Sequence, residues 1–241
     1  MVSGINNQVK NCFKKVFNLV RLNLGNYINN KRDKTEDDYT SKFMDILEES
    51  WVEERLNDCL GASSDSQLYK ISIGVKRHPR HYEGKYSKSD IGIVLEISSK
   101  EQYVVKAILV QAKVAKDSLN SRRINEFKLT EYDPTQNKRL HDKTSSSYYF
   151  IYAPSRIPNN KFKGISVIST VELQGFKKSK PSLADLKDAV FRFETFLVDI
   201  FIACATGDSK EETIKLARAQ KNDDVFSADY TVEITVKSKL Q

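Results

Sequence analysis

The sequence has no long apolar stretch. None of its hydrophobic runs approaches the roughly 20 residues that span a bilayer, and the first segment, MVSGINNQVKNC, lacks the apolar core of a signal peptide. We therefore expect a cytoplasmic protein without a membrane segment. Low-complexity tracts, internal repeats and long linkers are also missing, which favours a single domain over residues 1–241.

Cysteine and histidine are scarce. The three cysteines, Cys12, Cys59 and Cys204, occupy helix-like apolar positions without C-x-x-C spacing, so buried free thiols are expected rather than a zinc site or disulfides. His78 and His81 have no Cys or His partner at ligand spacing, which also argues against zinc. Either histidine could still act as an accessory proton carrier.

What the chain does contain is an ordinary globular composition with a basic excess. Its 241 residues, 39% of them hydrophobic, suffice for one α/β domain with a sizeable core. A formal net charge of +7 and a pI near 9.1 suit a polyanionic partner, although the same excess occurs in proteins that bind no nucleic acid.

The segment from Lys88 to Lys116 predicts two adjacent strands. Apolar residues alternate after Asp90, and VVKAILVQAK is almost continuously apolar, which is typical of a strand buried on both faces. The polar link 98–102 predicts a hairpin that brings Asp90 close to Gln111. Because side chains alternate along a strand, Gln111 and Lys113 share one face.

Asp90 followed by Gln111-Ala112-Lys113 resembles the core of the PD-(D/E)xK nuclease superfamily. The Gln-x-Lys variant is similar to Mrr-like restriction endonucleases and to nuclease effectors of bacterial anti-phage defence. The resemblance implies a restriction-endonuclease-like mixed central sheet flanked by helices, and Mg2+ or Mn2+ held by oxygens of Asp90 and Gln111. It also implies that Lys113 assists the attacking water. Gln replaces the commoner acid, and Ser89 precedes the aspartate where proline is usual.

A further metal ligand is expected on an upstream helix. Thr35 and Asp38 form the pattern of a capping box, and Glu36 begins a stripe that is apolar further along. Such a carboxylate either stabilises the helix start or points inward. The segment TEDDYTSKFMDIL resembles the part of these nucleases that carries a metal-associated glutamate, which implies Glu36, with Asp37 as the rival.

Several basic or polar side chains are candidates for nucleic-acid contacts. The segment KRHPRHYEGKYSK and the end of the second strand provide the cations, and Tyr82 or Tyr86 could stack on bases, although a solvated hairpin tip has the same composition. Asp133 and Pro134 predict a helix start, and the resemblance implies that a glutamine on that helix supports the site or the substrate. The predicted contacts are Arg77, Arg80, Lys85, Lys88, Lys116 and Gln136.

The remaining elements are expected around this core, which the resemblance places at about 35–172. We predict an N-terminal helix over 4–22, an Asn-rich turn over 23–30, and strands over 68–76, 147–154 and 163–173. A long helix over 182–204 has a wide apolar surface, which predicts either burial or a contact face for a second copy or an activating partner subunit. DYTVEITVKSK predicts a final edge strand.

Three functions fit these observations. The first is a metal-dependent DNA endonuclease in bacterial restriction or anti-phage defence, with RNA as an alternative substrate. The second is a catalytically inactive module on the same fold that binds nucleic acid. The third is a protein that binds a partner through its C-terminal helix.

Overall fold

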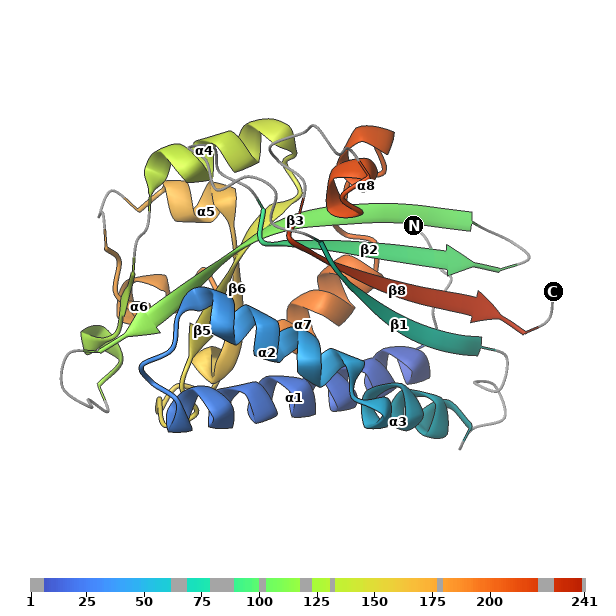
Figure 1. Ribbon diagram of the computed structural model, residues 1–241, viewed down its shortest axis with the longest axis horizontal. Helices are drawn as coiled ribbons and strands as arrows, with labels where there is room; N and C mark the ends of the chain where they lie inside the picture. Colours follow the sequence, from blue (N-terminus) through green and yellow to red (C-terminus); the bar gives the residue numbers. More distant parts are fainter. Residues whose placement is uncertain are drawn as a thin grey trace.

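The computed structural model describes residues 7–61, 69–78, 89–99, 103–117, 123–130, 133–176, 180–220 and 228–239. At its centre is a mixed β-sheet flanked by helices on both faces, so the predicted fold class is confirmed (Figure 1). No helix among these residues is both long and apolar enough to cross a bilayer.

The described sheet has eight strands, and its path runs β1-β8-β2-β3-β5-β6-β7. β2 and β3 form the predicted antiparallel hairpin, whereas β5 runs parallel to β3. β4 lies off the path and pairs with the end of β3. The strands are β1 (Tyr69–Arg77), β2 (Ile91–Ser98), β3 (Tyr103–Lys116), β4 (Lys128–Leu129), β5 (Ser147–Ala153), β6 (Gly164–Ser169), β7 (Phe191–Arg192) and β8 (Tyr230–Ser238).

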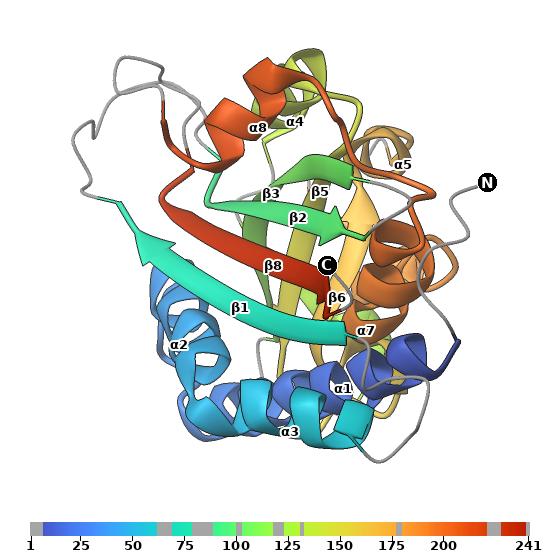
Figure 2. The ribbon, with the colours of Figure 1, turned by 90° about the vertical axis from the view of Figure 1, so that its right-hand side faces the viewer.

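The prediction of an edge strand at the end of the chain is wrong. β8 lies between β1 and β2, antiparallel to β1 and parallel to β2 (Figure 2). Val232, Ile234 and Val236 join the core on one face, and Thr231 is buried on the other. Alternating apolar and polar residues indicate a strand but do not reveal how many neighbours it has.

One face of the sheet packs on the helices that begin the chain and on the segment around residues 193–202. Their buried side chains form the largest hydrophobic cluster, with Phe43, Phe150 and Phe193 in mutual edge-to-face contact. These elements are α1 (Asn7–Asn30), α2 (Glu36–Glu48), α3 (Ser50–Gly61), α7 (Phe193–Thr195) and the π-helix η3 (Phe196–Ile202).

The other face is covered by shorter elements. Leu140 and Leu216, from α4 and α8, pack on the centre of the sheet, and a further cluster lies under α5 and α6. The elements are η1 (Ile124–Glu126), α4 (Pro134–Lys143), η2 (Asn160–Phe162), α5 (Thr170–Gln174), α6 (Leu183–Leu186) and α8 (Glu211–Ala217). The strand predicted over 163–173 therefore ends at Ser169, where Ser169 caps α5.

The long helix predicted over 182–204 is absent. α6 ends at Leu186, β7 pairs with β6, and only then do α7 and η3 follow. The apolar side chains that suggested a contact face, such as Phe196 and Phe201, are buried within the chain itself. The apolar residues of this segment recur at helical spacing, but they do not form one helix. Pairing with β6 and burial in the core determine the conformation of the backbone instead.

The N-terminal helix is longer than predicted, and the cysteine prediction is partly wrong. Val20, Leu24 and Ile28 are buried at successive four-residue steps, so α1 continues through the Asn-rich segment to Asn30. Cys12 and Cys59 form a disulfide between α1 and α3, which lie side by side; Cys204 is the free thiol. Sequence spacing could not show the contact between these two helices.

Candidate active site

The predicted catalytic residues meet where β3 leaves β2. Pairing between the two strands ends at Ile91 and Val110, but β3 continues to Lys116. Further along β3, β4 pairs with Ala115 and Lys116. Among the described strands, none pairs with residues 111–114 on the edge that β2 has left, because β5 lies on the opposite edge. At this fork between β2 and β3, side chains of the site can contact the backbone of β3.

In this fork, Asp90 forms hydrogen bonds to β3 at the point where β2 no longer pairs with it. Its amide donates to the carbonyl of Val110 at 2.9 Å. Its carboxylate oxygen Oδ2 accepts from the amide of Ala112 at 2.6 Å and from Nε2 of Gln111. Because the N–H and C=O of one strand residue point to the same side, the carbonyl of Ala112 faces this gap as well.

Glu36 and Lys113 form an ion pair beside Asp90. The ammonium of Lys113 lies 3.3 and 3.2 Å from the two carboxylate oxygens of Glu36. Only 6% of the Lys113 side chain is exposed, against 22% for Glu36. The predicted capping box of Thr35 and Asp38 is present and fixes the start of α2, so Glu36 rather than Asp37 reaches Lys113.

Gln136 belongs to the same network. From the first turn of α4, its Nε2 donates to Oε1 of Gln111 at 2.9 Å. The Gln111 amide therefore turns its nitrogen to Asp90 and its oxygen to Gln136. A metal ligand must offer its oxygen beside Asp90, so the Gln111 amide would have to rotate by about 180°. The Gln136 amide would then have to rotate as well to keep the hydrogen bond. Both rotations fit the site, because the two ends of an amide fill nearly the same space.

The charges of the site are unbalanced. Burial raises the pKa of Asp90 well above its ordinary value, and the nearby charge of Glu36 raises it further. The hydrogen bond from Ala112 and the charge of Lys113 oppose this pKa shift, whereas Asp229 adds to it. Two carboxylates thus lie beside one ammonium in a partly buried site.

Tyr152 lies near Asp90 and Glu36, and its place beside the site was not predicted from the sequence. Its hydroxyl lies 3.1 Å from that of Thr40, and burial raises its pKa well above the ordinary range, with smaller contributions from Asp90 and Glu36. The phenol is therefore neutral. The pattern SYYFIYA predicts the strand, but nothing in it distinguishes this tyrosine from its neighbours.

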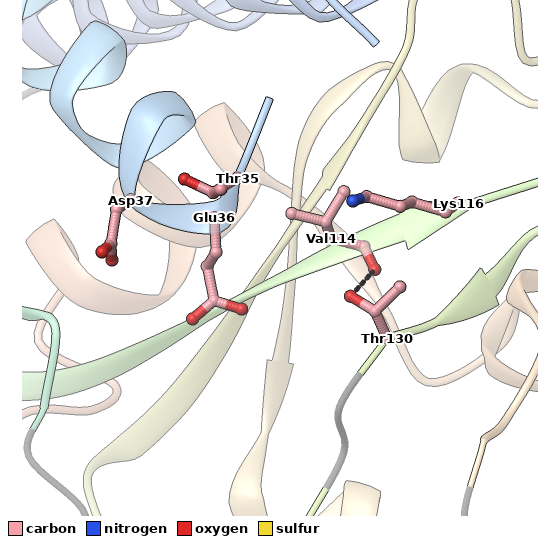
Figure 3. A pocket seen from close by; sticks show the side chains of 6 residues that line it. All are labelled: Thr35, Glu36, Asp37, Val114, Lys116 and Thr130. Atoms are coloured by element: carbon pink, nitrogen blue, oxygen red, sulfur yellow. Dashed lines mark hydrogen bonds between the residues drawn. The ribbon is translucent and has the colours of Figure 1, made fainter. Parts of the chain in front are cut away.

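A pocket of about 250 Å3 opens on Glu36. The first turn of α2 forms one side, and the ends of β3 and β4 form the other (Figure 3). The ammonium of Lys116 points toward the start of α2, and Thr130 donates to the carbonyl of Val114 at 3.1 Å. The lining residues are Thr35, Glu36, Asp37, Val114, Lys116 and Thr130.

Among the other predicted contacts, only Arg77 is described, and it is not part of this cluster. Arg77 forms ion pairs with Asp45 and Glu48 of α2 at 2.8 and 2.7 Å, so its charge is balanced within the protein. His78 contacts the hydroxyl of Thr231 at 2.8 Å, and burial is the main cause of its lowered pKa. Arg80, Lys85 and Lys88 lie outside the described residues, as do His81, Tyr82 and Tyr86.

The described residues contain no group of three or more His, Cys, Asp or Glu side chains arranged to hold a metal ion. Comparison of the chain with protein-family models, with curated proteins and with solved structures finds no match.

Proposed function

We propose that the protein is a metal-dependent endonuclease that hydrolyses phosphodiester bonds of DNA, in the cytoplasm and in the context of bacterial restriction or anti-phage defence. The observation that carries the proposal is the convergence of Asp90, Gln111 and Lys113 with Glu36 at the fork in the sheet. RNA is the alternative substrate, since nothing in these residues selects the sugar.

The donor set fits a divalent cation such as Mg2+ or Mn2+. Asp90 and Glu36 are close enough for the charge of one to raise the pKa of the other, and a cation between them would relieve this repulsion. Asp90, Glu36 and, after rotation of its amide, Gln111 would hold the ion. Few carboxylates suffice, because Mg2+ keeps several waters and binds substrate phosphate oxygens. When bound, the ion supplies positive charge to a phosphate group that becomes more negative during hydrolysis.

The protein side chains have separate tasks in this proposal. Lys113 is nearly buried, so its ammonium acts with little screening by water on a phosphate or on the attacking water. Gln136 fixes the plane of the Gln111 amide. Tyr152 stays neutral and adds no charge near Asp90.

Cleavage assays test the proposal. A supercoiled plasmid and a single-stranded circular DNA are incubated with Mg2+ or Mn2+ and with EDTA, and metal-dependent cutting is expected with the native protein but not with Lys113→Met. Lys106→Met is the matched control, because Lys106 is a second buried lysine of β3 but donates to carbonyls of Phe201 and Thr206 instead. Failure to cut either DNA, together with no metal binding in calorimetry, refutes the proposal. Equal loss of cutting in both variants would show that Lys113 has no specific role in the cleavage reaction.

One observation favours a second function, a catalytically inactive module that binds nucleic acid or a partner. The polar groups of the site satisfy one another, through Gln136, Gln111 and Asp90 and through Lys113 and Glu36. Such a network can also serve only to hold the sheet together. This function predicts binding that weakens steeply with salt, persists in Asp90→Asn and leads to no cleavage.

A further inference from the structure

We infer that the site accepts one unpaired strand, either single-stranded nucleic acid or a nucleotide displaced from a duplex, in preference to an intact double helix. This inference rests on the proposed function and specifies its substrate class.

The first argument is the depth of the catalytic groups. Side-chain exposure is 6% for Lys113, and Gln111 is only 3% exposed. A double helix carries its phosphates on the outside of a stiff rod with a persistence length of about 50 nm. A phosphate on such a rod reaches a recessed ammonium less easily than a phosphate on a flexible single strand does.

The second argument is the size of the opening. The pocket of about 250 Å3 is smaller than most small-molecule sites, which measure roughly 300–1,000 Å3. It admits part of one nucleotide but not a base pair. Glu36 lines this pocket and forms the ion pair with Lys113, so the pocket opens on one of the proposed metal ligands.

The third argument is the distribution of charge around the opening. Lys116 provides one cation at the pocket, on the side opposite α2. Glu36 and Asp37 place two carboxylates on the other side. Without metal, these carboxylates repel each phosphate backbone that comes near, so a single backbone held by Lys116 is repelled less than the two backbones of a duplex.

Binding measurements without metal test the inference directly. Fluorescence anisotropy in EDTA compares a labelled single strand with the blunt duplex of the same sequence, and we expect the single strand to bind at least about tenfold more tightly, a difference of about 1.4 kcal/mol. Equal or tighter binding of the duplex overturns the inference, even if the protein cuts DNA. Preferential binding of the single strand without any cleavage refutes the nuclease proposal but supports the substrate class.

Two lysine variants show whether the pocket is responsible. Lys116→Ala should lower the slope of log K against log salt for the single strand by about 0.7, the value for one lost phosphate contact. Lys128→Ala is the matched control, because Lys128 is exposed, lies opposite Lys116 across the β3–β4 ladder and does not line the pocket. Equal effects of the two changes would mean that general charge attraction, not the pocket, selects the strand.

Discussion

The ion pair between Glu36 and Lys113 yields a quantitative prediction about stability. At 3.2 Å, and with an effective dielectric constant of about 20, the gross attraction is about 5 kcal/mol. Desolvation of the nearly buried ammonium offsets much of it, and Glu36 keeps part of its hydration because 22% of it is exposed. We therefore expect a coupling energy of about 1–3 kcal/mol between the two side chains.

A double-mutant cycle measures this coupling. Glu36→Gln leaves the ammonium of Lys113 without its carboxylate, and Lys113→Met leaves Glu36 and Asp90 without the ammonium. The double variant replaces the pair by neutral groups, so its cost should be smaller than the sum of the single costs. Urea unfolding followed by circular dichroism, in EDTA, gives the four free energies of unfolding.

Additive single effects would refute the reasoning. A coupling energy within about 0.5 kcal/mol of zero would mean that the two side chains do not form the pair in solution. The same cycle on Glu211 and Lys215 of α8 is the control, since this pair is exposed and should show a much smaller coupling.

Three further predictions concern stability and thiol content. In EDTA the stability of the native protein relative to Asp90→Asn should fall as the pH rises above about 4, because the folded state holds the proton of Asp90 more tightly than the unfolded state does; urea unfolding of both proteins at several pH values measures this difference. Gly92→Ala should cost roughly 1–3 kcal/mol in the same assay, because the added Cβ would lie 2.1 Å from the carbonyl oxygen of Ala217, whereas Gly74→Ala, with no atom within 4 Å of its new Cβ, should cost little. Thiol titration of the denatured, unreduced protein should find Cys204 alone, and a count of three thiols would contradict the disulfide.

The local features of the site could be predicted from the sequence. The capping box at Thr35, the hairpin that brings Asp90 to Gln111, and the cap of α4 at Asp133 all depend on residues near one another in the chain, and all are present. These features do not place Gln136 beside Gln111; the structure reveals the hydrogen bond between them.

Features that depend on distant contacts could not be predicted. Nothing in residues 230–238 indicates that β8 separates β1 from β2, because its alternation fits an edge or an interior strand equally well. The disulfide of Cys12 and Cys59 requires the contact between α1 and α3. The continuation of α1 to Asn30 could have been predicted, since Val20, Leu24 and Ile28 maintain the helical spacing through the Asn-rich segment.

The interior position of β8 has a consequence for the synthesis of the protein on the ribosome. Its first residues hold the backbone of the fork at Asp90, because the amide of Tyr230 donates to the carbonyl of Asp90. β8 ends 140 residues after β2, so at about 5–20 residues per second translation needs roughly 7–28 s to supply it once β2 has been made. Until then the nascent chain lacks the strand that supports Asp90. The proposed nuclease would therefore be inert while it is being made.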